Sequence, residues 1–146
     1  MIYNKVMLLN TDDIIKNTTY WRESSEQDLR VAQELFKLGH YPHCLFFCHL
    51  SVEKILKAIV VGSTKEFPPY THDLRKLAEI GNVSLNKSKE QTLDKISTFN
   101  IAGRYADAKF KFYQKYNKKE TAIKYLNITE NLIVWLKIEF RKTQLK

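Results

Sequence analysis

Glycine and proline are scarce in this chain of 146 residues, with four and three copies. Because these residues build tight turns, their scarcity argues against a turn-rich β protein and favours long helices. No apolar run approaches the roughly 20 residues that a membrane-spanning helix needs, and residues 1–10 are too short and too soon polar for a signal peptide. The sequence therefore predicts a cytoplasmic protein with one core and no membrane segment.

Cysteine is also rare, and the two copies, Cys44 and Cys48, lie four residues apart in a segment with a helical pattern. A disulfide between such neighbours is sterically poor, which favours reduced, buried thiols. The two thiols share a helical face and, with His43 or His49, can offer three ligands to zinc. They also adjoin an apolar stripe, where cysteine packs as a small hydrophobe, and only His72 lies downstream. We therefore expect core packing, and no metal or other cofactor.

Acidic residues are outnumbered, and the formal net charge is +8. The excess lies in the C-terminal part: residues 1–102 contain 13 Lys and Arg against 12 Asp and Glu, whereas residues 103–146 contain 11 against 4. Such a concentrated basic segment suits phosphate backbones or an acidic partner. A solvated lysine surface that aids solubility explains the charge equally well, so charge alone leaves both interpretations open.

Apolar residues recur with a helical period over most of the chain. This pattern predicts helices at about residues 20–38, 42–61, 74–80 and 89–101 and from about residue 119. The second helix is apolar round most of its girth, which is typical of a central core helix. Residues 1–18 show no clear period and are expected to lead into a domain that spans residues 19–146. The predicted fold class is all-α, an antiparallel up-and-down helical bundle of about five helices.

Polar and aromatic residues gather where the fourth expected helix stops, at Gly103. Arg104, Tyr105 and Asp107 follow, and then residues 109–119 form a basic, aromatic run without an apolar period. An arginine at such a position suits phosphate, and Tyr105 suits stacking on a base. The aromatic residues of the run can stack on single-stranded RNA or form an oligomer contact. Alternatively, Arg104 ties the loop to the bundle with Asp107 as its salt partner.

Glu53 lies on the most apolar helix, where a carboxylate is costly to bury without a cation or hydrogen-bond donors. Arg104 could bind it through a forked pair, and Lys57, one turn further along the helix, could also pair with it. His72 has a side chain whose ordinary pKa suits proton transfer at neutral pH. We expect His72 to cap the third helix or to fill the loop against the bundle.

Five short motifs follow one another along the chain, separated by segments without a recognisable motif. They are Asp28-Leu29, Gly39-His40-Tyr41, Phe47-Cys48-His49-Leu50-Ser51-Val52-Glu53-Lys54-Ile55-Leu56-Lys57-Ala58, Thr71-His72-Asp73-Leu74 and Phe99-Asn100-Ile101-Ala102-Gly103-Arg104-Tyr105-Ala106-Asp107. In this order they resemble the HEPN domain family (higher eukaryotes and prokaryotes nucleotide-binding), in its small stand-alone prokaryotic form. The family's usual wording at the last motif is Arg-Tyr-Pro-Asp, so Ala106 is a small departure. The resemblance covers about residues 20–140.

This resemblance implies a helical up-and-down bundle that commonly forms homodimers, often beside a minimal nucleotidyltransferase in toxin–antitoxin pairs. Many members are metal-independent RNases with an Arg-x(4–6)-His motif across a dimer cleft, in which His acts as acid and base and Arg stabilises the transition state. Here Arg104 is kept, but positions 109–111 hold no histidine. Lys111 stands at the longest spacing, and Tyr113 matches a tyrosine that some members carry two residues later. Protonated lysine neutralises phosphate but is a poor base, and His72 can substitute only if the fold brings it near Arg104.

The sequence thus predicts an HEPN-like protein with a degenerate RNase motif that binds RNA, a nucleotide or a nucleotidyltransferase partner. The expected binding residues are Asn100, Arg104, Tyr105, Asp107, Lys109 and Tyr113, with Glu53 and His72 in support. Any catalysis would rest on Arg104 and Lys111. Two alternatives stay open: a metal-independent endoribonuclease toxin with an atypical site, and a structural interaction module.

Overall fold

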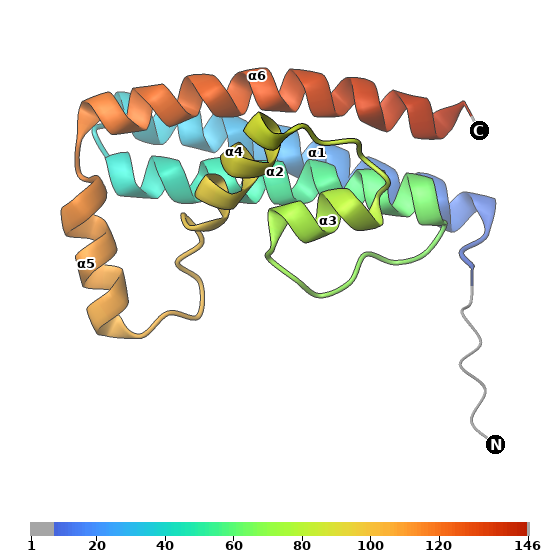
Figure 1. The fold of residues 1–146 in the computed structure, drawn as a ribbon, viewed down its shortest axis with the longest axis horizontal. Helices are drawn as coiled ribbons and strands as arrows, with labels where there is room; N and C mark the ends of the chain where they lie inside the picture. The colour runs from blue at the N-terminus through green and yellow to red at the C-terminus, as the bar shows by residue number, and fades with distance from the viewer. Residues whose placement is uncertain (1–7, 146) are drawn as a thin grey trace.

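Residues 8–145, the part of the chain that the computed structural model describes, form six α-helices and no β-strand (Figure 1). The helices are α1 (Thr11–Lys37), α2 (Tyr41–Thr64), α3 (Leu74–Ile80), α4 (Lys87–Ser97), α5 (Ala106–Tyr116) and α6 (Lys119–Gln144). The predicted all-α bundle is confirmed, with six helices in place of about five. Over these residues, no helix combines the length and the apolar character that crossing a membrane requires.

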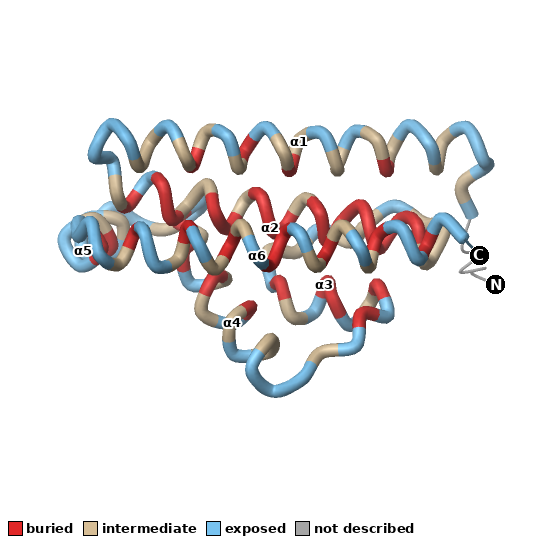
Figure 2. The backbone as a smooth tube through the Cα atoms, turned by 90° about the horizontal axis from the view of Figure 1, so that it is seen from above, coloured by how far each residue is buried: buried red, intermediate tan, exposed pale blue. Residues whose placement is uncertain are grey.

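The three long helices lie side by side, and α1 runs antiparallel to both α2 and α6 (Figures 1 and 2). Helices α2 and α6 point the same way, because α3, α4 and α5 carry the chain back to the end where α2 begins. Helices α3 and α4 cover α2 on the side away from α1 (Figure 2). Helix α2 therefore contacts all five other helices and forms the centre of the bundle, as its composition predicted.

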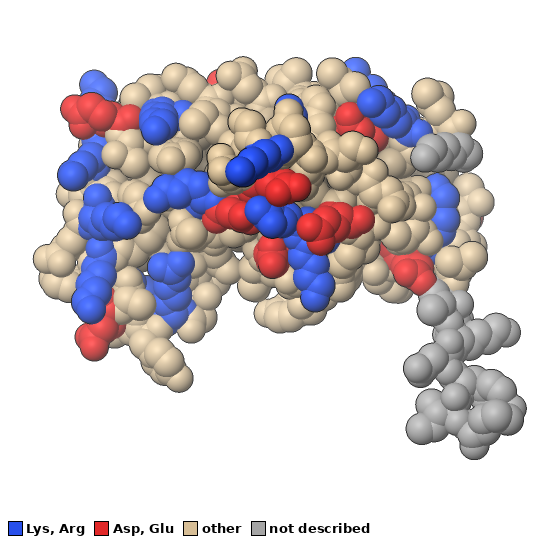
Figure 3. Space-filling view, in the orientation of Figure 1, with Lys and Arg blue, Asp and Glu red and all other residues tan. Residues whose placement is uncertain are grey.

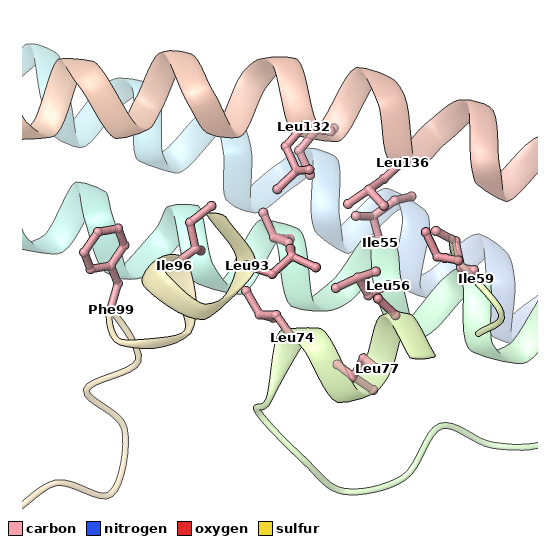
Figure 4. Close-up of a cluster of buried hydrophobic side chains, with 14 of the residues drawn as sticks. Ile55, Leu56, Ile59, Leu74, Leu77, Leu93, Ile96, Phe99, Leu132 and Leu136 are labelled. Carbon is pink, nitrogen blue, oxygen red and sulfur yellow. The ribbon is translucent and has the colours of Figure 1, made fainter. Parts of the chain in front are cut away.

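The hydrophobic core forms round the C-terminal half of α2. Ile55, Leu56 and Ile59 are fully buried there, and residues of α3, α4 and α6 point towards them (Figure 4). The facing residues are Leu74, Leu77, Leu93, Leu132 and Leu136, and the cluster continues through Ile96 of α4 and Phe99 of the following loop. Burial of each such side chain contributes about 1.5–3 kcal/mol to the free energy of unfolding, so this cluster holds the short helices α3 and α4 against the long ones.

Helix α1 begins at Thr11, well before the expected start near residue 20. The Asn10 side chain caps this start by accepting a hydrogen bond of 2.8 Å from the backbone N–H of Asp13. Asp12 and Asp13 lie in the first turn, where negative charge stabilises the positive end of a helix. Residues 11–18 of the expected lead-in are therefore helical, and residues 1–7 lie outside the described residues.

The basic, aromatic run that showed no apolar period forms most of α5, a helix that the sequence did not predict. Phe112 and Tyr116 lie four residues apart, on one face of the helix, and both are buried. Their ring centroids lie 6.5 Å and 5.3 Å from the ring centroid of Phe99, in edge-to-face contacts. These contacts hold α5 across the end of the bundle (Figure 1), and two residues in one short helix are too few to show a period.

We predict that Gly62→Ala lowers the free energy of unfolding by about 1 kcal/mol, measured by urea unfolding and circular dichroism. A Cβ atom at Gly62 would overlap the Thr143 Oγ1 atom and lie 3.0 Å from the Thr143 Cβ atom. This overpacking between α2 and α6 outweighs the helix propensity that alanine adds. In a Thr143→Ala background the same change should cost less, and an equal loss in both backgrounds would contradict the close contact.

Candidate functional site

The loop between α4 and α5 places Arg104 at one end of the bundle. Gly103 turns the chain with a φ angle of 77°, in the left-handed region that favours glycine. The Asn100 side chain accepts a hydrogen bond of 3.1 Å from the backbone N–H two residues on and so shapes the same turn. The Arg104 guanidinium donates a bond of 2.6 Å to the carbonyl of Thr98. Since this carbonyl lies at the negative C-terminal end of α4, the positive charge stabilises the helix end.

Arg104 lines an open hollow of about 320 Å³ beside α5, which we call the Arg104 groove. The groove is lined by Thr98, Arg104, Ala108, Lys111, Phe112, Lys115 and Tyr116. The Arg104 guanidinium carbon lies 5.7 Å from the centre of the Phe112 ring, a cation–π distance. Three lining residues are cationic and none is acidic, and Lys and Arg predominate over this end of the molecule (Figure 3). The groove is therefore suited to an anion.

A fourth cation, Lys95 of α4, lies next to the groove. Its ammonium group donates a hydrogen bond of 3.0 Å to the Tyr116 hydroxyl, and this bond raises the pKa of Lys95. Burial by itself would raise the pKa of Tyr116, but the bond from Lys95 and the charges of Lys95 and Lys115 outweigh burial and lower the pKa of Tyr116. Neither Lys95 nor Lys115 was predicted. The spacing of Lys111 and Lys115 at i and i+4 was the available signal, which needs α5 to be recognised as a helix.

Of the residues predicted for this site, only Arg104 and Lys111 line the groove. Tyr105 is 89% exposed, and Asp107 is exposed in the first turn of α5. Lys109 is half-buried outside the groove lining. Asp107 forms no salt bridge with Arg104 within residues 8–145, so the alternative with Asp107 as salt partner is not observed: Arg104 bonds a backbone carbonyl instead.

Tyr113 points away from the Arg104 groove. It follows the buried Phe112, and successive residues of a helix are rotated by about 100° round the helix axis. The Tyr113 ring stacks on the His43 ring of α2, with centroids 5.0 Å apart and planes inclined by 16°. Both residues line a second hollow with Gly39, His40, Pro42 and Asn117. This stacked pair was not predicted, since nothing in the spacing connects the start of α2 to α5.

Glu53 and His72 contact each other at a second place, outside the lining of the Arg104 groove. The His72 Nδ1 atom lies 2.6 Å from the Glu53 Oε1 atom, and the His49 Nε2 atom lies 3.4 Å from the same oxygen. Lys57 approaches the other oxygen, Oε2, at 3.4 Å. Of the two partners weighed for Glu53, Lys57 is therefore observed and Arg104 is not. His72 contacts Glu53 and does not line the Arg104 groove, so it is not placed to act as a base beside Arg104.

The Glu53 side chain is 5% exposed, and that of His49 is fully buried. Burial by itself would raise the pKa of Glu53, but the close approach of His49, the hydrogen bond with His72 and the charge of Lys57 outweigh burial and lower the pKa to about 2. Glu53 is thus ionised at neutral pH. In the described part of the chain, His49, Glu53 and His72 form the group of side chains with a spacing that could hold a metal ion.

The two cysteines pack in the core, as expected. Cys44 and Cys48 are fully buried and form an apolar cluster with Ala32 and Leu126. Neither thiol belongs to the group round Glu53, so the thiol-based zinc site considered from the sequence is not formed within residues 8–145.

We predict that stability falls more steeply with acid in the wild type than in Glu53→Gln. A glutamate in an unfolded chain titrates near about pH 4.3, above the folded pKa of Glu53. Its contribution is therefore complete above the unfolded pKa and is lost as the pH falls towards the folded value of about 2. Urea unfolding in EDTA should show a difference between the two profiles of about 2–3 kcal/mol between about pH 5 and pH 2. Parallel profiles would show that Glu53 adds no such stability.

Comparison with known structures shows two similar folds. TT1696 from Thermus thermophilus superposes with a TM-score of 0.71 at 18% identity, and the match covers 84% of this chain and 98% of that one. ST0689, described as an archaeal HEPN homologue, gives a TM-score of 0.65 at 17% identity and covers 85% of this chain and 98% of its own. At such low identities these likenesses concern the fold alone.

No functionally curated protein is similar enough in sequence to match the chain. The sequence profile of the HEPN domain does match, over residues 18–139. This range extends from within α1 to the last turns of α6 and so includes the Arg104 groove and the group round Glu53. The chain therefore belongs to the HEPN domain family.

Proposed function

We propose that the Arg104 groove binds the phosphate groups of RNA or of a nucleotide. The observation that carries this proposal is the convergence of Arg104, Lys111 and Lys115 on one hollow that has no acidic lining residue. Lysine and arginine contacts to phosphates supply most of the sequence-independent affinity for nucleic acids. Phe112 and Tyr116 also belong to the groove lining, and because both are buried they hold in place the helix that carries Lys111 and Lys115.

The geometry of Arg104 supports this function. A guanidinium carries five N–H donors in a planar fork that matches phosphate oxygens. The bond to Thr98 uses the Nη2 atom and fixes the side chain against the end of α4. A guanidinium held in this way loses little side-chain entropy when it binds an anion, because its rotamer is already set.

Binding without cleavage is the better interpretation of the motif. Lys111 stands where the family's histidine would stand at its longest spacing, and a protonated lysine cannot accept a proton. His72 contacts Glu53 and does not line the groove. A second candidate, a metal-independent endoribonuclease, is favoured by one observation: Arg104 and Lys111 share the groove, where both could stabilise a negatively charged transition state.

The protein further acts as a homodimer, paired with a minimal nucleotidyltransferase in a toxin–antitoxin-type system. Membership of the HEPN family supports this part of the proposal. Tyr105 and Phe110 support the dimer, because they are 89% and 62% exposed at the α5 end of the molecule, next to the groove. Large exposed aromatic side chains near one another often mark a contact between proteins.

We expect Lys111→Ala combined with Lys115→Ala to weaken the binding of a fluorescein-labelled single-stranded RNA by about tenfold or more, measured by fluorescence anisotropy in EDTA. The slope of log K against log salt should fall by about 1.4, or 0.7 for each lost phosphate contact. The control removes two exposed lysines elsewhere, Lys16 and Lys76, and changes the net charge equally. Equal weakening in both double variants would show a general charge effect and overturn the groove as the binding site.

The same variants distinguish the other interpretations. RNA cleavage in EDTA that the groove variant loses and the control retains would favour the endoribonuclease. Arg104→Ala removes the bond to Thr98, so it should lower the melting temperature as well as RNA affinity. If Arg104→Ala lowers the melting temperature, and neither this variant nor the lysine double variant changes RNA affinity, then the role of Arg104 is structural only.

We expect sedimentation equilibrium to show that the wild type is a dimer. The double variant Tyr105→Ser and Phe110→Ser should raise the Kd of the dimer at least tenfold, because both rings are exposed near the groove. Tyr70→Ser is the matched control, because Tyr70 is 93% exposed on another loop. A monomeric wild type, or equal weakening by the control, would contradict a dimer contact at α5.

A further inference from the structure

We propose that His49, Glu53 and His72 form a binding site for a transition metal ion of the Zn²⁺ type. The proposal is independent of the Arg104 groove, whose lining contains none of the three residues. His49 and Glu53 come from one face of α2, at i and i+4, and His72 comes from the loop that precedes α3. Two imidazoles and one carboxylate are a common ligand set for zinc.

The distances suit one ion. The three ligand atoms lie within 4.8 Å of one another. Ligand atoms at about 2.1 Å from a tetrahedral zinc ion are about 3.4 Å apart, and the His49 Nε2 to Glu53 Oε1 distance is 3.4 Å. The His72 Nδ1 atom lies closer to this oxygen, at 2.6 Å, as a hydrogen-bond donor. His72 must therefore lose its Nδ1 proton and move back by a little under 1 Å.

His49 is buried beside the Glu53 carboxylate without a hydrogen bond. Its side chain is fully buried, and neither of its ring nitrogens has a hydrogen-bond partner within residues 8–145. An unpaired buried polar group destabilises the folded state. The Nε2 atom faces the Glu53 carboxylate at a distance that is long for a hydrogen bond. A metal ion between nitrogen and carboxylate would use the unpaired nitrogen.

The Glu53 carboxylate is oriented for this role. Its Oε1 atom faces both imidazoles, whereas its Oε2 atom faces the ammonium group of Lys57. The ammonium group also lies 4.9 Å from the centre of the Trp21 ring, which holds it in place. Contacts of this kind, to the oxygen that does not bind the metal, fix the direction of a ligand carboxylate.

The surroundings favour metals that bind imidazole. Glu53 and Lys57 nearly cancel in charge, so the site attracts a divalent cation weakly through charge alone. Mg²⁺ and Ca²⁺ require several oxygen ligands, whereas Zn²⁺ and Co²⁺ bind imidazole nitrogen well. The His72 side chain is 39% exposed, so the ion can enter from solvent, and a water molecule can complete the tetrahedron on that side.

Metal binding would link the loop before α3 to the middle of α2. We therefore expect it to raise the stability of the fold and to leave RNA binding in the groove unchanged. We expect the chain, free of any affinity tag, to bind one Co²⁺ with the visible absorption of a tetrahedral site. Zn²⁺ should displace the Co²⁺, and competition with a chromophoric chelator gives its Kd. Mg²⁺ should not compete, and Zn²⁺ should raise the melting temperature.

His72→Ala should weaken Zn²⁺ binding at least 100-fold and abolish the rise in melting temperature, because one of three protein ligands is lost. His72 is partly exposed, so this variant should keep the fold, which far-ultraviolet circular dichroism checks. Glu53→Gln should weaken binding similarly, and if it fails to fold, His72→Ala decides. His43→Ala, an exposed histidine on the same helix, is the matched control and should bind as the wild type does.

Three results would overturn the site: no stoichiometric binding of Co²⁺ or Zn²⁺, unchanged affinity in His72→Ala, or loss of binding in His43→Ala. The last would place the ion at the surface pair His40 and His43, whose ring centroids are 6.1 Å apart. Since binding is read without RNA, failure here leaves the proposed function of the groove untouched.

Discussion

Because α2 is apolar on nearly every face, water must be excluded from it on all sides, and the other five helices are arranged to do so. Helix α1 covers one side, α3 and α4 cover the opposite side, and α6 packs along its length. This requirement also explains the path of the chain. Because three short helices carry the chain back to the end where α2 begins, α6 can lie parallel to α2. A helix that followed α2 after a tight turn could pack against it only in the antiparallel direction.

The same burial determines the chemistry of Glu53. A carboxylate in the middle of such a helix must recruit its own partners, and Glu53 has three, from its own helix and from the loop before α3. Charge at the surface follows the opposite rule. The cations of the Arg104 groove lie at the end of the bundle, where α5 crosses it and its outer face meets solvent (Figures 1 and 3). Buried and exposed charges thus occupy separate places in the molecule.

The sequence was sufficient to predict features that depend on a single helix. The long period of apolar residues predicted α2, α6 and most of α1, and the i, i+4 spacing offered the contact of Glu53 with Lys57 as one of two alternatives. It was insufficient where a contact joins distant segments. The pairing of His72 with Glu53 and the stacking of Tyr113 on His43 depend on how loops and helices meet. The partner of Arg104 escaped prediction for another reason: it is a backbone carbonyl, which every residue carries.

The parallel arrangement of α2 and α6 has a consequence for the order of folding. Helices α1 and α2 adjoin in sequence, so they can pair through local contacts at little cost in loop entropy. The contacts of α2 with α6 join residues such as Gly62 and Thr143, which are far apart in the chain. During synthesis, one side of α2 therefore stays open to water until α6 has left the ribosome. Until then the nascent chain is vulnerable to aggregation, and this vulnerability ends only when α6 docks.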